Sequence, residues 1–158
     1  MGNLHFASAI LALTFGSLVL LQKKATRFHR KIGMAYVVSM SFMLLTSFMT
    51  YRLYGRFGTF HYMSVFATIV LAVGMLPMWF KRPRNNYKLL HINFMYWSVI
   101  GLYMALFSEV FTRIPETPFY KMVFWASLGV LVLGFVGHWM FFPKWRQRFN
   151  VYKAGNHG

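Results

Sequence analysis

The sequence contains no cysteine and only two acidic residues among its 158. Without cysteine, the chain cannot form disulfides, cysteine-held iron–sulfur clusters, zinc sites with cysteine ligands or a thiol nucleophile. It also has no Walker or dinucleotide glycine pattern, no nucleophile elbow and no paired-histidine zinc helix. These absences argue against the chemistries that soluble enzymes commonly use.

Most of the residues are apolar. Hydrophobic residues make up 58% of the chain and aromatic residues 20%, whereas charged residues make up 12%. This composition is far too apolar for a soluble domain and is typical of a membrane protein. Five apolar runs are each long enough to cross a bilayer as a helix. We therefore expect an all-α membrane protein with five transmembrane helices in a helical bundle, at about 4–22, 32–51, 59–80, 89–111 and 120–142.

The basic residues predict the orientation of the chain. Thirteen of the seventeen Lys and Arg residues fall on one side of the five spans, and four fall on the other. Because cytoplasmic loops carry the excess of Lys and Arg, the N-terminus should lie outside and the C-terminus in the cytoplasm. Residues 1–145 would then form the transmembrane domain, and residues 146–158 a basic cytoplasmic tail.

The net charge of +15 raises the question of a partner. The basic residues lie beside apolar runs and not on a soluble face, so anionic lipid headgroups on the cytoplasmic side are a better partner than nucleic acid. Three glycines on the last span, Gly129, Gly134 and Gly137, would let another helix approach closely. They leave room for a membrane-protein partner or a homo-oligomer.

The histidines fall into two layers in this topology. His29, His91 and His138 lie near the cytoplasmic ends of spans, whereas His5 and His61 lie near the outer surface. Imidazole binds haem iron, zinc and copper and also carries protons near neutral pH. The alternative is structural, with each ring hydrogen-bonded at a helix end.

His29 and His91 are the most suggestive pair. Each opens the inward face of its span, and two such faces at one depth can hold a planar cofactor between them. We expect a single b-type haem here, with a transition metal (Zn, Fe or Cu) or no cofactor as alternatives. The residues expected to contribute are His29, His91, Arg30, Lys88, Met95 and Tyr36, with the two basic residues placed to neutralise haem propionates.

The outer layer suggests a metal site instead. His61 and Glu109 should reach similar depth in an antiparallel pair of spans, with His5 nearby, and two imidazoles with a carboxylate suit zinc or non-haem iron. His138, in the inner layer, is a further candidate ligand. Against this, Arg113 follows Glu109 by four residues and can satisfy that carboxylate without a metal.

Several stretches resemble a known family. They are HRKIGMAYV, GRFGTFH, and a histidine and methionine four apart before YWSVIGLYMALFSEVFTRIP. This pattern, over residues 23–115, resembles a family of small bacterial multi-span proteins defined only as domain of unknown function two-three-zero-six. The matching positions are His29, Gly33, Tyr36, His61, His91, Met95, Glu109, Arg113 and Pro115. The resemblance implies the inner membrane of a bacterium but no activity.

A more distant similarity is to the ascorbate-reducible transmembrane b-type cytochromes, whose alternate helices pair histidines around haem. It implies one site from His29 and His91. A second site would need a partner for His61 in the stretch PFYKMVFWASLG, which contains no histidine. The function we expect is thus electron transfer or sensing by a histidine-bearing core. The alternatives are a non-catalytic accessory subunit of a membrane complex, or a transporter of protons or small molecules.

Overall fold

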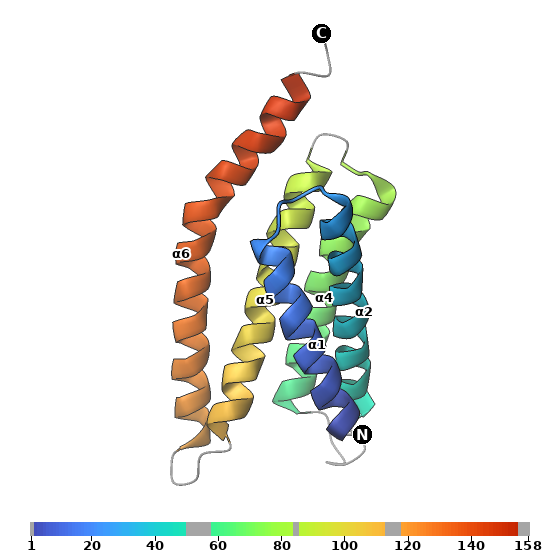
Figure 1. Cartoon of the computed structure of the whole chain (residues 1–158). Helices are drawn as coiled ribbons and strands as arrows, with labels where there is room; N and C mark the ends of the chain where they lie inside the picture. Colours follow the sequence, from blue (N-terminus) through green and yellow to red (C-terminus); the bar gives the residue numbers. More distant parts are fainter. Residues whose placement is uncertain (1, 50–57, 84–85, 113–117, 155–158) are drawn as a thin grey trace. The chain divides into compact units, whose positions relative to one another are not determined.

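The computed structural model describes residues 2–49, 58–83, 86–112 and 118–154, and every regular element in these ranges is an α-helix. It divides into two compact units, residues 1–72 and 73–158. The first unit holds α1, α2 and the first part of α4, and the second holds the end of α4, α5 and α6 (Figure 1). The helices are α1 (Gly2–Leu21), α2 (Arg27–Met49), α4 (Thr59–Phe80), α5 (Tyr87–Thr112) and α6 (Phe119–Ala154).

All five helices are long and apolar enough to cross a membrane. Their candidate spans run over 2–21, 27–49, 61–80, 87–110 and 121–147. A helix is favoured in lipid because it satisfies all its backbone donors and acceptors internally. The chain is therefore a multi-pass integral membrane protein, and the expected all-α fold with five spans is confirmed.

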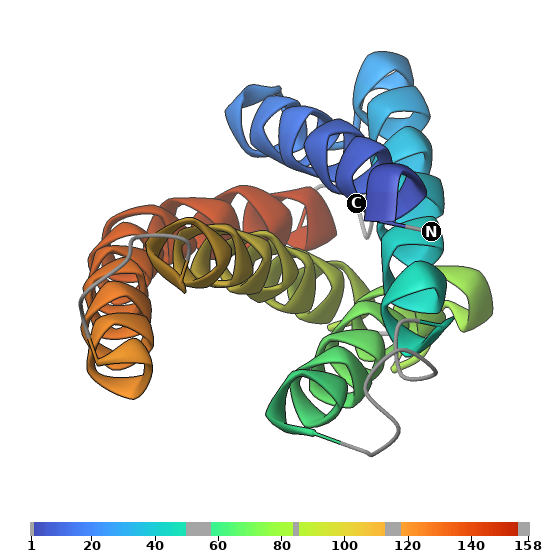
Figure 2. The same ribbon diagram turned by 90° about the horizontal axis from the view of Figure 1, so that it is seen from below.

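In the first unit, α1 and α2 form an antiparallel hairpin, and Figure 2 shows the two ribbons crossing side by side. Residues at a spacing of three or four on α1 are buried, and three of the four are small: Ser8, Ala12, Gly16 and Val19. Small side chains on one face allow close approach of the neighbouring helix. The hairpin is thus held by packing along most of its length.

The turn between α1 and α2 is closed by two caps. The Lys24 ammonium group donates to the carbonyl oxygens of Val19 (2.7 Å) and Leu20 (2.8 Å), which have no donor within the helix. At the start of α2, the Thr26 hydroxyl accepts a hydrogen bond from the backbone N–H of His29 (3.0 Å). This is the usual N-cap geometry. It explains why α2 begins at Arg27, five residues before the apolar run that starts at residue 32.

In the second unit, α5 and α6 lie side by side and antiparallel (Figure 1). Two glycines of α6 make room for α5. A Cβ added at Gly134 would lie 2.8 Å from Ile100 Cγ2, and one added at Gly137 would lie 2.5 Å from the Tyr96 hydroxyl. That hydroxyl donates to the Gly134 carbonyl oxygen (2.7 Å). The glycines therefore permit both the contact and the hydrogen bond.

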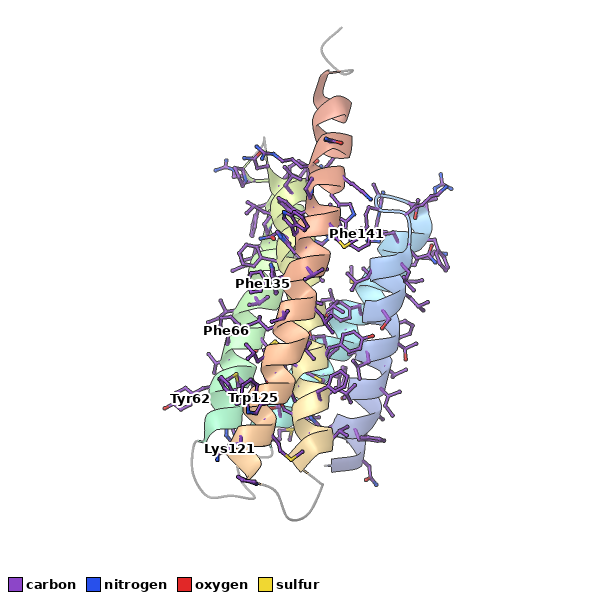
Figure 3. The ribbon with its side chains drawn as sticks, turned by 90° about the vertical axis from the view of Figure 1, so that its left-hand side faces the viewer. Tyr62, Phe66, Lys121, Trp125, Phe135 and Phe141 are labelled. Atoms are coloured by element: carbon purple, nitrogen blue, oxygen red, sulfur yellow. The ribbon has the colours of Figure 1, made fainter. Side chains whose placement is uncertain are left out.

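α6 is longer than its apolar run. The run was expected to end near residue 142, but the helix continues through Pro143 to Ala154, so residues 146–154 of the expected tail are helical. Only 11% of the α6 span is buried. Trp125 and Phe135 lie on its surface, as Tyr62 and Phe66 do on α4 (Figure 3), and all four side chains are more than half exposed. Lipid tails are the natural environment of these faces.

Candidate functional site

The ring of His91, near the start of α5, is oriented by a short hydrogen bond to the neighbouring helix. Its Nδ1 lies 2.7 Å from the carbonyl oxygen of Gly74 on α4. A carbonyl oxygen can only accept, so Nδ1 carries the hydrogen and the neutral ring keeps its lone pair on Nε2. A backbone carbonyl bonded to one ring nitrogen commonly fixes the tautomer and orientation of a metal-binding histidine. The Nε2 atom of His91 is therefore the one that can bind a metal ion.

Two features of α4 bring its backbone within reach of His91. Gly74 has no side chain, and a Cβ there would lie 2.9 Å from Met95 Sδ and 3.3 Å from Phe94 Cβ. Pro77 lies inside α4 and has no N–H, so the carbonyl of Val73, four residues earlier, loses its helical donor. The sequence at this point therefore allows α5 to approach α4 closely, beside a locally weakened stretch of helix.

Lys88 and Met95 share a face of α5 with His91. They lie three residues before and four residues after it, a spacing that aligns side chains on one side of a helix. Met95 is buried, whereas Lys88 is half-buried near the end of the span. The predicted histidine, methionine and lysine are therefore brought together on this helix.

His138, on α6, lies in an aromatic cluster. Its Nε2 is 2.8 Å from Asn93 Oδ1 on α5, and its ring stacks on Phe142 with 4.6 Å between centroids. Trp97 and Tyr96 of α5 approach the same ring at 5.7 and 5.8 Å. The contacts give His138 a role in joining α5 to α6.

His5 joins α1 to α2 in the first unit. Its Nδ1 lies 3.2 Å from the Met43 carbonyl oxygen and 3.1 Å from Thr46 Oγ1. The Thr46 hydroxyl donates its own hydrogen to backbone carbonyls, including that of Met43 at 2.8 Å, so it accepts from the imidazole. His5 Nδ1 is therefore the donor to both atoms, and its neutral ring keeps a lone pair on Nε2.

His61 has the opposite arrangement. Its Nδ1 accepts a hydrogen bond from the backbone N–H of Gly58 (3.2 Å). The backbone N–H of His61 in turn donates to the Gly58 carbonyl oxygen (3.0 Å). This reciprocal pair resembles a capping box at the start of α4. Because Nδ1 accepts, the neutral ring carries its hydrogen on Nε2. Metal binding through Nε2 would require the proton to move to Nδ1 and the cap to break.

The remaining residues of the expected haem site lie on α2. His29 is half-buried at the third position of the helix, Arg30 beside it is exposed, and the Tyr36 side chain is fully buried. His29 belongs to the first unit and His91 to the second. Their pairing around a cofactor therefore stays a prediction.

The expected outer metal site is likewise divided between the units. His5 and His61 belong to the first unit, whereas Glu109 and His138 belong to the second, where Glu109 is exposed on α5. In neither unit do three or more His, Asp or Glu side chains come together as a metal-binding group, over the residues that the structure describes. Arg113, the expected partner of Glu109, lies outside those residues.

The hydrogen-bonding groups around the histidines were not predicted from the sequence. Side chains inside the spans bond two of the histidines: Asn93 bonds His138, and Thr46 bonds His5. The Tyr96 hydroxyl bonds the Gly134 carbonyl, and the Gly74 carbonyl bonds His91. The sequence does mark Asn93, Thr46 and Tyr96 as candidates, because polar side chains within a span need hydrogen-bonding partners there. No side-chain property marks a backbone carbonyl as an acceptor, so Gly74 gave no such signal.

The fold and these contacts define a class: a multi-pass helical membrane protein whose spans carry hydrogen-bonded histidines. The chain matches no protein-family model, no curated protein and no solved structure. The resemblances noted in the sequence therefore remain predictions.

Proposed function

We propose that this protein is a membrane-embedded electron-transfer or sensing module for a single b-type haem, which His91 would help to hold. The observation that carries the proposal is the hydrogen bond from His91 Nδ1 to the Gly74 carbonyl oxygen (2.7 Å). It favours His91 over His61, whose Nδ1 accepts a hydrogen bond, because the tautomer of His91 leaves Nε2 as the ligand atom on a face of α5 that also carries the buried Met95.

The other residues have distinct roles in this proposal. His29 would be the second residue to hold the haem, and the buried Tyr36 lies farther along the same helix. Arg30 and Lys88 pair with the propionates, since charge-assisted bonds from Arg or Lys to carboxylates are among the stronger hydrogen bonds. A haem bound by two histidines supplies reversible one-electron transfer. The bacterial inner membrane is the compartment in which we place this activity.

An absorption spectrum of the detergent-purified protein, with iron analysis of the same sample, tests the proposal. We expect a Soret band and about one iron per chain, and loss of both in His91→Ala and His29→Ala. His138→Ala is the matched control, because its ring bonds Asn93 and packs among aromatic residues. Added imidazole should restore the band in His91→Gly, since it replaces the missing ligand without replacing the side chain's packing.

Other outcomes of this experiment would overturn the haem proposal. A colourless, iron-free protein would do so directly. Stoichiometric zinc or copper without a Soret band would favour the metal alternative, whose candidate ligands are His61, Glu109, His5 and His138. A band that persists in His91→Ala would show that another side chain holds the haem.

A second function is favoured by a separate observation, the exposure of α6. With 11% of its span buried, this helix exposes apolar side chains on more than one side, and Phe124, Leu133 and Trp139 are all more than half exposed. Such an exposed apolar surface suits a non-catalytic accessory subunit whose partner is another membrane protein. Co-purification of stoichiometric partner chains with a colourless, metal-free protein would favour this function.

A further inference from the structure

Basic side chains gather at one end of the second unit. Four of them are exposed: Lys81, Arg82, Lys144 and Arg146. The first two follow the last residue of α4, and the other two lie on α6 just after Pro143. Among the described residues of this unit, the only Lys or Arg near the opposite end is Lys121, at the start of α6.

The register of α5 and α6 places these groups at one level. Asn93 and His138 are joined by a hydrogen bond of 2.8 Å. From that pair, five residues back along α5 lead to Lys88 and six residues forward along α6 lead to Lys144. At 1.5 Å per residue these steps rise about 8 and 9 Å, so both lysines reach the same height. Tyr87 and Lys88 begin α5 directly after the connection that carries Lys81 and Arg82.

Trp145 fixes the orientation of α6 at this level. Its ring packs against Tyr96 of α5 (5.8 Å between centroids) and stacks on Phe141 (6.0 Å). Successive residues of a helix are about 100° apart, so Lys144 and Arg146 lie to either side of the seam that Trp145 closes. The seam between α5 and α6 is thus flanked by two exposed cations.

Exposed apolar rings lie immediately beneath the basic groups. Trp79 and Phe80 end α4 and are 63% and 69% exposed, and Trp139 on α6 is 80% exposed. Tryptophan is enriched where lipid headgroups meet the hydrocarbon core. A lipid whose chains lie against these rings has its phosphate at the height of the basic side chains.

We propose that this basic end of the second unit binds the headgroup of an anionic phospholipid, with Lys144 and Arg146 contacting the phosphate. A lipid is the occupant that the observations favour, because the cations border exposed apolar rings on helices that span the bilayer. Basic clusters beside spans are attracted to anionic headgroups by about 1 kcal/mol for each Lys or Arg, which is about fivefold in affinity. The site is independent of any haem.

Native mass spectrometry of the full chain tests this inference. The protein is equilibrated with equal amounts of phosphatidylglycerol and phosphatidylcholine of identical acyl chains, and the retained lipids are counted. We expect a preference for phosphatidylglycerol that falls about 25-fold in the double variant Lys144→Gln, Arg146→Gln. Lys121→Gln is the matched control on the same helix and should keep the full preference.

Both variants change exposed side chains, and a helical circular dichroism spectrum equal to that of the wild type verifies their folding. Raising the salt concentration should weaken the preference, because salt screens exposed charges. Equal retention of the two lipids by the wild type would overturn the inference. So would a double variant that retains phosphatidylglycerol as well as Lys121→Gln does.

Discussion

One residue type serves different purposes in this protein, and the neighbouring atom decides which. His91 donates from Nδ1 to a carbonyl, whereas His61 accepts at Nδ1 from a backbone N–H. The two neutral rings therefore carry their hydrogens on opposite nitrogens. Sequence identifies both as histidines near span ends but contains no information about the tautomer. The distinction makes His91 a better candidate than His61 for binding a metal or haem. His61 has a structural role at the start of α4 that needs no cofactor.

Lys24 leads to a prediction about pH. Burial lowers the pKa of Lys24 from 10.5 to about 8 in the folded protein, where its ammonium group caps α1. Between pH 8 and 10.5 the unfolded chain therefore binds more protons than the folded one, and the free energy of unfolding should rise with pH across this window. Below pH 8 the contribution of Lys24 should be constant. Unfolding in detergent, followed by circular dichroism at a series of pH values, measures the trend.

Lys24→Gln is the control for this experiment. Glutamine can still reach the carbonyl oxygens but does not titrate, so the rise should be smaller than in the wild type. Identical pH dependence of the two proteins would contradict the role assigned to Lys24.

Thr46 leads to a prediction about the α1–α2 hairpin. Thr46→Val keeps the shape of the side chain but removes the oxygen that lies 3.1 Å from His5 Nδ1. The loss should destabilise the protein by about 1 kcal/mol, which lies within the range for hydrogen bonds between spanning helices. Thr14→Val is the matched control, because the exposed Thr14 hydroxyl donates to the Ile10 carbonyl of its own helix. Equal unfolding free energies for the two variants, measured by steric trapping in bicelles, would refute the assignment.

At the scale of the helices, glycine position decides how closely α5 and α6 pack. Gly137→Ala would place a Cβ 2.5 Å from the Tyr96 hydroxyl, which is held by the Gly134 carbonyl. Because overpacking of this kind costs about 1–3 kcal/mol, we expect a clear loss of stability. Gly129→Ala, on the same helix, has open space at its Cβ and should be neutral or slightly stabilising. Thermal unfolding in detergent compares the two, and a Gly137→Ala protein as stable as Gly129→Ala would rule out the packing.

The sequence predicts the helices well and their ends less well. Apolar runs marked all five spans, because a helix that crosses lipid must be apolar over about 20 residues. The run at 32–51 gave no sign that α2 begins at Arg27, where the cap from Thr26 decides the boundary. Nor did the run at 120–142 predict the continuation of α6 to Ala154, since charges that leave the hydrocarbon do not end a helix.

For the site, the sequence predicts which residues are candidates but not what each contacts. The sequence predicts Lys88, His91 and Met95 as residues of one site, and the structure places them on one helix, with His91 and Met95 against Gly74 of α4. The bond to Gly74 depends on how closely two helices approach, which is a tertiary property. His138 shows the same limit, because its neighbours Asn93 and Phe142 come from different helices.

At the scale of the whole molecule, five spans place the two ends of the chain on opposite sides of the membrane. The distribution of Lys and Arg predicts an outer N-terminus and a cytoplasmic C-terminus. Because the chain contains no cysteine, single cysteines introduced at exposed sites report this orientation without background labelling. Asn3→Cys should react with an impermeant maleimide in intact cells, and Gln147→Cys should react only after lysis. The reverse pattern would show that the orientation is inverted.

The continuous helix α6 has a mechanical consequence. Its 36 residues span about 54 Å, well beyond the hydrocarbon thickness of about 30 Å. The projecting part continues the helix inside the bilayer, but Pro143 lies between the two and has no N–H, so the carbonyl of Trp139, four residues earlier, loses its helical donor. We therefore expect α6 to bend most easily at this proline, where the span meets the basic end of the helix.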